Sequence, residues 1–251
     1  RYDLDLRTND ETYVRLFSRY FRYILPILSQ YDATRGGNII LIQNENEHHM
    51  PLVPGRMEYF QIITNLFREC GFKVPVIHCN RLFEGMTKCS AIECVNTWDN
   101  PADDLETLRS AQPTAPLLVT EFWCGGVDGW GNPHYGKEAW LVAKKAMEII
   151  GCGAQINYYM WHGGTNFNFM GGRLQYDLSY YVPTSYDLDA PLGEGCVLTA
   201  KYYATRLVNL LSDTFSDWLA DTSPSRRFYQ DGVKTAFISE GKKGNWLFLE
   251  F

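Results

Sequence analysis

The stretch N-I-I-L-I-Q-N-E-N-E, residues 38–47, runs four apolar residues into five polar ones. Ile39 to Ile42 favour a β-strand, and because they do not alternate with polar residues they predict a parallel strand buried on both faces. We expect this strand over 38–43, directly after Gly36-Gly37. Carboxylates and amides are costly to bury without partners, so the strand is predicted to end at a ligand site or at solvent.

Composition limits what that site belongs to. The 251 residues are 45% hydrophobic, which allows one barrel-sized domain or two small ones. A net charge of −6 without a basic run argues against a nucleic-acid partner, and no apolar run approaches the roughly 20 residues of a membrane span. The seven Trp and sixteen Tyr suit a sugar-stacking site, although a large core explains them equally well.

The cysteines and histidines give little sign of a metal centre. The seven cysteines contain no C-x-x-C pair, which argues against zinc and leaves buried thiols and disulfides both open. His48 and His49 are adjacent, and neighbouring side chains point apart on a strand, so they are poor joint ligands. We expect neither a metal nor an organic cofactor.

Helices and strands alternate on both sides of the opening stretch. In chain order we expect a helix over 10–30, the strand over 38–43, a helix over 56–70, strands over 74–78 and 91–95, a short helix over 105–110, a strand from 117, a helix over 139–150, a strand over 155–161 and a helix over 198–211. This order predicts an α/β fold with a parallel sheet, whose right-handed crossovers bring the carboxyl ends of all strands to one edge.

The first helix carries the clearest signals. Its apolar residues recur at intervals of three and four, which marks one helical face. Asp10 is a suitable N-cap, and Pro26 is expected to kink or end the helix.

The pattern changes after the last helix. A linker begins near 214, and two β-type runs then flank E-G-K-K-G at 240–244, which predicts a hairpin. Because an isolated hairpin is marginally stable, we expect the first strands of a β-rich domain that is cut short at 251. The predicted division is therefore 1–213 and 214–251.

Two glutamates follow apolar strand starts. If both strands lie in one parallel barrel, Glu47 and Glu121 emerge at the same face, where one can donate a proton to a glycosidic oxygen and the other attack the anomeric carbon. The plainer alternative for either glutamate alone is a solvated or salt-bridged carboxylate.

Glu45 competes with Glu47 for the donor role, because alternation puts both on one face of the strand. Glu47 lies farther toward the carboxyl end and is favoured, while Glu45 is expected to support the site through hydrogen bonds. Strict alternation also turns Asn46 away from Glu47, so a substrate-binding Asn46 requires the strand to end or bulge there.

Four stretches carry a family resemblance: I-I-L-I-Q-N-E-N-E at 39–47, L-L-V-T-E-F-W at 117–123, N-Y-Y-M-W-H-G-G-T-N-F at 157–167 and T-S-Y-D-L-D-A-P-L-G-E at 184–194. In this order they resemble the retaining β-galactosidases of glycoside hydrolase family 35. The resemblance implies a (β/α)8 TIM barrel, with the acid/base after strand four and the nucleophile after strand seven.

Matched residue by residue, the resemblance makes Glu47 the acid/base and Glu121 the nucleophile. Asn46 then contacts the hydroxyl beside the anomeric carbon, and Tyr159 and Tyr186 match tyrosines near the sugar. The expected reaction is removal of terminal β-galactose from an oligosaccharide or glycoconjugate, with retention and a covalent galactosyl-enzyme.

One departure keeps alternatives open. Leu188 stands where a second tyrosine is common in the family, so another retaining exo-β-glycosidase, acting on glucosamine or glucose, remains a rival. A galactose-binding protein without turnover is the rival from another class, and the presence of both carboxylates argues against it.

The resemblance also predicts a partial barrel. Three barrel strands precede R-T-N-D-E-T-Y in the family, so we expect the chain to cover strands four to eight and the first strands of a β-rich domain. Expressed alone, such a piece is expected to be aggregated, molten or dimerised through its sheet edges, and inactive, because its edge strands lack neighbours. A secreted, periplasmic or lysosome-like compartment is favoured by resemblance alone, and the oligomeric state stays open.

Overall fold

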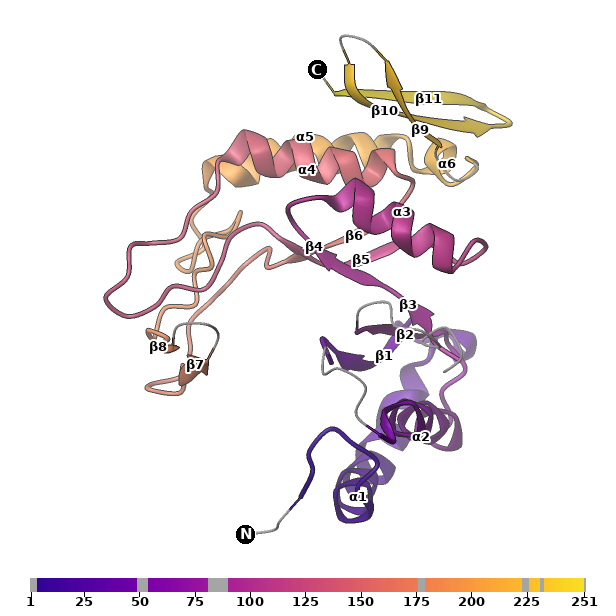
Figure 1. Cartoon of the computed structure of the whole chain (residues 1–251), viewed down its shortest axis with the longest axis vertical. Helices are drawn as coiled ribbons and strands as arrows, with labels where there is room; N and C mark the ends of the chain where they lie inside the picture. Colours follow the sequence, from indigo (N-terminus) through magenta and orange to yellow (C-terminus); the bar gives the residue numbers. More distant parts are fainter. Residues whose placement is uncertain are drawn as a thin grey trace. The chain divides into compact units, whose positions relative to one another are not determined.

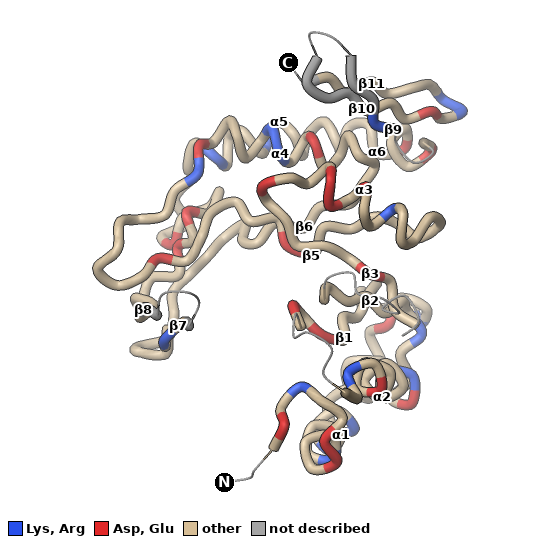
Figure 2. The backbone as a smooth tube through the Cα atoms, viewed as in Figure 1, with Lys and Arg blue, Asp and Glu red and all other residues tan. Residues whose placement is uncertain are grey.

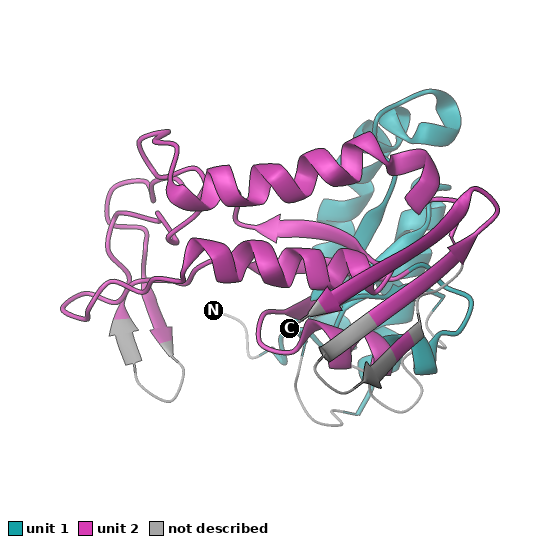
Figure 3. Ribbon diagram, turned by 90° about the horizontal axis from the view of Figure 1, so that it is seen from above, with its two compact units in different colours: residues 1–95, 108–116 teal, residues 96–107, 117–251 magenta. Residues whose placement is uncertain are grey.

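A computed structural model describes residues 4–48, 54–80, 90–175, 179–222, 226–230 and 233–250 (Figure 1). Within it the chain forms two compact units (Figure 3). Unit 1 comprises residues 1–95 and 108–116, and unit 2 comprises residues 96–107 and 117–251. The predicted domain boundary after residue 213 stays a prediction.

Unit 1 begins with helix α1, Glu11–Leu28, which confirms the first predicted helix. The Asp10 side chain caps it by accepting a hydrogen bond from the Tyr13 N–H at 2.8 Å. The helix continues through Pro26 to Leu28, and 3-10 turns follow at Ser29–Tyr31 and Ala33–Arg35.

Helix α2, Arg56–Glu69, packs against α1 through aromatic and aliphatic side chains. The rings of Phe17 and Tyr59 meet edge to face, with centroids 5.9 Å apart. Tyr59, Ile63 and Phe67 recur at intervals of four on one face of α2, and all three are buried.

Strands β1 (Ile42–Asn46), β2 (Val76–Cys79) and β3 (Ile92–Glu93) form a parallel sheet in the order β1-β2-β3. The predicted strand over 38–43 is therefore wrong in position, because the polar residues themselves form β1. Ile39 bonds elsewhere: its N–H donates to the Tyr31 carbonyl and its carbonyl accepts from the Ala33 N–H, both at 2.8 Å. Ile40 is 67% exposed, so the expected burial on both faces is also wrong there.

Asp32 fixes the connection between the 3-10 turns and the start of β2. Its buried carboxylate accepts hydrogen bonds from the N–H and hydroxyl of Thr34 and from the N–H groups of Lys73 and Val74. The hydroxyl of Thr34 in particular holds the pKa of Asp32 well below its usual range.

Unit 2 contains the sheet β4-β5-β6, formed by Val95–Thr97, Leu118–Trp123 and Gln155–Tyr159, in which β5 and β6 are parallel. Its helices are α3 (Pro101–Ala111, partly in unit 1), α4 (Ala139–Gly151) and α5 (Ala200–Thr214). Helices α4 and α5 run side by side (Figures 1 and 3). The parallel strands and alternating helices confirm the predicted α/β class.

A three-stranded antiparallel sheet ends the chain, in the order β11-β10-β9. Its strands are β9 (Arg226–Gln230), β10 (Val233–Gly241) and β11 (Gly244–Glu250), with the short helix α6 (Ser216–Leu219) before them. Gly241 pairs with Gly244, which confirms the predicted hairpin. The sheet packs on α4, where a Cβ at Gly151 would lie 3.1 and 3.3 Å from the rings of Phe248 and Phe237.

A second hairpin, which the sequence did not predict, lies in the long loop after β6. Strands β7 (Arg173–Gln175) and β8 (Ser179–Tyr181) pair in antiparallel fashion.

Candidate active site

Acidic positions lie along β1 and on β5 (Figure 2). Gln43 pairs with Ile77 and Asn46 pairs with Cys79, so three steps along β1 match two along β2. This β-bulge is followed by Glu47, whose φ is 50° and whose N–H donates to the Cys79 carbonyl at 2.6 Å. Bulges re-aim side chains and are common beside active sites. Alternation is broken here, as it must be if Asn46 and Glu47 act at one site.

The carboxylate of Glu45 is occupied by hydrogen bonds. Arg7 donates to both oxygens, at 2.9 and 2.7 Å, the Tyr59 hydroxyl donates at 2.9 Å and the Asn46 N–H at 2.8 Å. Burial acts to raise the pKa of Glu45, but the bonds from Arg7 and Asn46 outweigh it, so the pKa lies below its ordinary value. A carboxylate held ionised in this way is suited to supporting the site and not to donating a proton.

The segment before α1 is fixed onto the end of β1. Arg7 also donates to the Asn46 carbonyl at 2.7 Å, and Nε2 of His48 lies 2.6 Å from the Arg7 carbonyl. A carbonyl oxygen only accepts, so Nε2 of His48 carries the hydrogen. The His48 N–H donates to Asn80 at 2.9 Å. His48 is thus a buried structural residue, and His49 lies outside the described residues.

Strand β5 bulges at the second candidate glutamate. Thr120 and Glu121 stand opposite the single residue Asn157 of β6. Nδ2 of Asn157 donates to the Thr120 carbonyl at 2.8 Å, and the Thr120 hydroxyl donates to Asn96 at 2.8 Å. The irregular backbone at Glu121 is therefore held by side chains from strands on either side.

One face of β5 and β6 carries three of the polar groups. Nε1 of Trp123 donates to Oε2 of Glu121 at 3.0 Å. Trp123 is the ladder partner of Tyr159, whose hydroxyl lies 2.9 Å from that of Tyr186. Paired residues of neighbouring strands share a face, so Glu121, Trp123 and Tyr159 point to the same side.

Lys137 holds the backbone of Trp123 in place. Its Nζ donates to the Trp123 carbonyl at 2.7 Å and lies 3.5 Å from the ring centroid of Trp98. Burial lowers the pKa of Lys137 to about 8. The carboxylate of Asp189 accepts from the Lys137 N–H at 2.7 Å and from Nζ of Lys201.

Leu188, the departure noted in the sequence, is only 6% exposed and has a φ of 59°. Its carbonyl oxygen lies 1.8 Å from where a Cβ at Gly125 would stand, so only glycine fits at that position. The side chain at 188 is therefore interior, and the polar groups on this side come from Tyr159 and Tyr186.

Glu194 ties the loop after β6 to the segment that contains Tyr186. Its carboxylate accepts from the hydroxyls of Ser185, at 2.5 Å, and Thr165, and these bonds hold its pKa below the ordinary value. The Glu194 N–H donates to the Asp187 carboxylate at 2.6 Å. Because Ser185 and Asp187 both bond to Glu194, this network fixes the backbone on either side of Tyr186.

The two units divide the predicted site residues. Unit 1 brings together Glu45, Asn46 and Glu47, and unit 2 brings together Glu121, Tyr159 and Tyr186. Sequence reasoning missed Arg7 and Trp123. Alternation along T-E-F-W puts Trp123 on the face of Glu121 and was a usable signal. Arg7 is 38 positions from Glu45, and no local pattern joins them.

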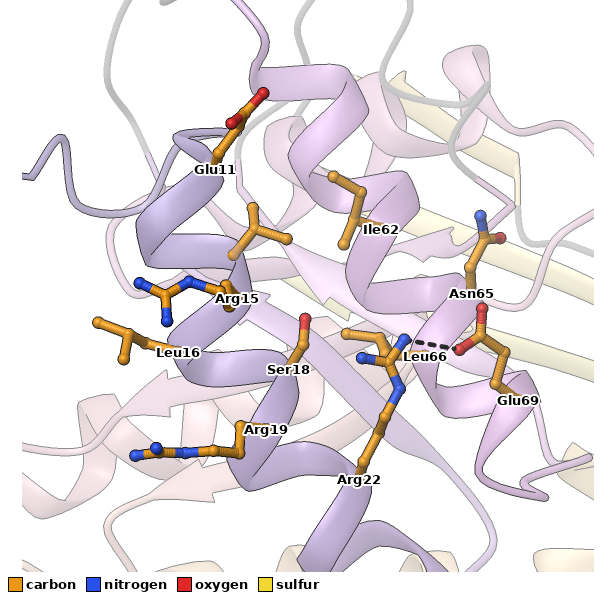
Figure 4. Close-up of a pocket in the computed structure, with 11 residues that line it drawn as sticks. Glu11, Arg15, Leu16, Ser18, Arg19, Arg22, Ile62, Asn65, Leu66 and Glu69 are labelled. Atoms are coloured by element: carbon orange, nitrogen blue, oxygen red, sulfur yellow. Dashed lines mark hydrogen bonds and ion pairs between the residues drawn. The ribbon is translucent and has the colours of Figure 1, made fainter.

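A hollow of about 800 Å³ lies between α1 and α2 (Figure 4). Arg15, Arg19 and Arg22 line it along α1, and Arg22 pairs with Glu69 at 3.2 Å. It contains none of the predicted site residues.

Within the described part of the chain, no three or more His, Cys, Asp or Glu side chains gather as a metal site would require. Six cysteines there carry free thiols, and Cys89 lies outside it. None of the described helices combines the length and apolar character of a membrane span.

Comparison with known proteins identifies the family. The model of glycosyl hydrolases family 35 matches residues 1–211, and the chain belongs to this family. It is 32% identical to human beta-galactosidase over 209 residues, which are 80% of this chain and 30% of the human protein. It is 32% identical to the mouse beta-galactosidase-1-like protein over 213 residues, 82% of this chain and 32% of that protein.

The chain thus spans about 30% of the length of the curated relatives it matches. Among solved structures, the chain is similar to a GH27 β-L-arabinopyranosidase from Geobacillus stearothermophilus, with a TM-score of 0.46 and 9% sequence identity. The match covers 92% of this chain and 48% of that one.

Proposed function

We propose that this chain is the catalytic part of a retaining exo-β-galactosidase that removes terminal β-galactose through a covalent galactosyl-enzyme. The observation that carries the proposal is that, in a chain of family 35, Glu47 directly follows the bulged end of β1 and Glu121 lies at the bulge of β5, and both are parallel strands. In a closed (β/α)8 barrel such ends meet at one mouth, and retaining enzymes hold their carboxyl groups about 5 Å apart.

The hydrogen bonds support a division of roles. Arg7 and Tyr59 hold the Glu45 carboxylate ionised, which suits a supporting role, and Glu47, which follows the bulge of β1, is the acid/base. In the first step an oxygen of Glu121 bonds to the anomeric carbon, the bond to the leaving oxygen breaks, and Glu47 gives that oxygen its proton. In the second, Glu47 takes a proton from water, whose oxygen displaces Glu121 from the same carbon.

The remaining residues bind the sugar. Asn46 contacts the hydroxyl beside the anomeric carbon, and the hydroxyl pair of Tyr159 and Tyr186 bonds the galactose ring. Trp123 orients Glu121 by donating to it. The buried Leu188 keeps a glucosidase or glucosaminidase as the second candidate, because it supplies no hydroxyl where the family resemblance leads us to expect a tyrosine.

The test is azide rescue in the protein produced from its complete natural reading frame. Glu121→Gly should lose nearly all turnover of a chromogenic β-galactoside, and azide should restore it by forming the α-galactosyl azide. Turnover like that of the wild type, or rescue through the β-azide, would exclude this role. The matching β-glucoside and β-glucosaminide, assayed in parallel, decide between the two candidate sugars.

A further inference from the structure

A second pocket, of about 520 Å³, opens on the loops that follow β5 and β6. Trp130 from the first loop lines it, together with Asn168, Phe169, Arg173, Tyr181 and Thr184 from the second. Its volume lies within the range of about 300–1,000 Å³ that is typical of ligand sites.

Its aromatic side chains are turned outward. Phe169 is 91% exposed, Trp130 77% and Tyr181 65%, so none of the three contributes to the core of unit 2. Several large exposed rings around one hollow are unusual on a soluble surface and mark a binding surface. Trp and Tyr combine an apolar ring face with a polar group, which suits a ligand of mixed character.

The pocket is held together by backbone hydrogen bonds. The Trp130 N–H donates to the Tyr181 carbonyl at 2.7 Å, which joins the two loops, and the Asn166 N–H donates to the Thr184 carbonyl at 2.8 Å. The Thr184 hydroxyl donates to the Asn168 carbonyl at 3.1 Å. The backbone that carries the exposed aromatic rings is thus held by hydrogen bonds, which lowers the entropic cost of binding a ligand.

Two polar side chains complete the lining. The amide of Asn168 and the guanidinium of Arg173 have no hydrogen-bond or ion-pair partner among the residues that the structure describes. An amide both donates and accepts, and a guanidinium donates in several directions, which fits a ring of hydroxyl groups. Aromatic faces beside such groups match a pyranose, which has apolar C–H faces and a polar rim.

One residue of the pocket lining lies close in sequence to the site proposed above. Thr184 on its rim is two residues from Tyr186, whose hydroxyl meets that of Tyr159 on the face of Glu121. We propose that this pocket binds the leaving-group saccharide of an extended galactoside, with Phe169 and Trp130 stacking on its rings and Arg173 bonding its hydroxyls. This inference rests on the proposed function and assigns it an oligosaccharide substrate.

The test compares two substrates in the protein made from its complete reading frame. β-Galactosyl fluoride has a leaving group too small for the pocket, whereas a β-galactosyl-terminated trisaccharide reaches it. Phe169→Ala should lower kcat/KM for the trisaccharide about tenfold and leave that for the fluoride unchanged within about twofold. Phe167→Ala is the matched control, since Phe167 is 81% exposed on the same loop but does not line the pocket.

Equal kcat/KM values for wild type and Phe169→Ala on the trisaccharide, or equal losses on both substrates, would overturn the proposal. A change in sedimentation of Trp130→Ala without the selective loss would also overturn it, in favour of a protein interface. If the fluoride is not hydrolysed, the proposed function fails by itself. Calorimetric titration with the trisaccharide then decides, because Phe169→Ala, but not Phe167→Ala, should weaken its binding about tenfold.

Discussion

The indole nitrogen of Trp123 lies 3.0 Å from Oε2 of Glu121, two positions away on the same strand. Successive side chains of a strand alternate, so this spacing puts donor and acceptor on one face. The contact is charge-assisted, and Lys137 fixes the Trp123 backbone from the other side. The orientation of the proposed nucleophile is therefore set within its own strand.

Replacing Trp123 by Phe should slow the proposed reaction while keeping the ring. A hydrogen bond to a charged group contributes about 1.5–3 kcal/mol, so kcat/KM for a β-galactoside should fall about ten- to a hundredfold. Trp140→Phe, on the exposed face of α4, is the control and should have no effect. Steady-state kinetics on both variants checks this, and unchanged activity in Trp123→Phe would remove its role.

The two glutamates of unit 1 should respond differently to the leaving group. A proton donor matters most when the leaving group is poor, so Glu47→Gln should lose far more activity on natural galactosides than on dinitrophenyl galactoside. Glu45→Gln should reduce both rates alike, because it disturbs the support from Arg7 and Tyr59. The assignment is reversed if the selective loss is found at Glu45.

Glu45 should also contribute to stability above acidic pH. Its folded pKa is lowered, so the contribution is complete above the unfolded value of about 4.3 and is lost as the pH falls through the folded pKa. At pH 7 Glu45→Gln should reduce the free energy of unfolding by on the order of 2 kcal/mol, with a smaller difference from wild type in acid.

Glu69→Gln is the control for that measurement, since it removes an exposed ion pair with Arg22 that is worth roughly 0–1 kcal/mol. Urea unfolding at neutral and acidic pH measures both variants. A Glu45→Gln deficit that does not change with pH would show that the ionised carboxylate is not what stabilises this end of β1.

Lys137 should also make stability rise with pH, but in the alkaline range. Burial lowers its folded pKa to about 8, below the unfolded value of about 10.4, so between these values the unfolded chain binds more protons and stability rises with pH. After allowance for solvent screening of a half-buried group, the rise should be on the order of 1 kcal/mol. Lys137→Met should lack this rise in the free energy of unfolding, which urea unfolding near pH 8 and pH 10 measures. The same rise in wild type and Lys137→Met would show that Lys137 is not its source.

The sequence predicted the helices better than the strands. α1 and α2 carry long apolar stripes at helical spacing, and both form within a few residues of the expected bounds. β1 was misplaced because four consecutive apolar residues do not reveal which backbone they bond to, and Ile39 bonds to the 3-10 segment. β9 was missed because its two arginines give the segment a polar pattern that does not indicate a strand. In the structure Arg227 forms ion pairs with Asp103 and Glu106.

The candidate site was predictable where its residues are close in sequence. The strand ends that carry Glu47 and Glu121 follow from apolar runs that stop at polar residues. The contact of Arg7 with Glu45 and that of Lys137 with Trp123 depend on segments brought together by folding, and no spacing rule encodes them. The condition on Asn46, that its strand must bulge or end, came from alternation alone, and the bulge is present.

The bulges in β1 and β5 allow the position of a glutamate along the strand to be chosen independently of the face to which its carboxylate points. In a regular strand, moving a functional group by one residue turns it to the opposite face and breaks the packing of every residue beyond it. Here the extra residue of the bulge takes up the one-residue shift in register. On β5 the Asn157 side-chain amide holds the bulge in place by donating to the Thr120 carbonyl. A one-residue deletion at Thr120 would restore the regular ladder and place Glu121 directly opposite Asn157, without the Thr120 carbonyl to which the Asn157 amide now donates. The placement of Glu121 on β5 thus depends partly on strand length, a property that substitution scans leave unchanged.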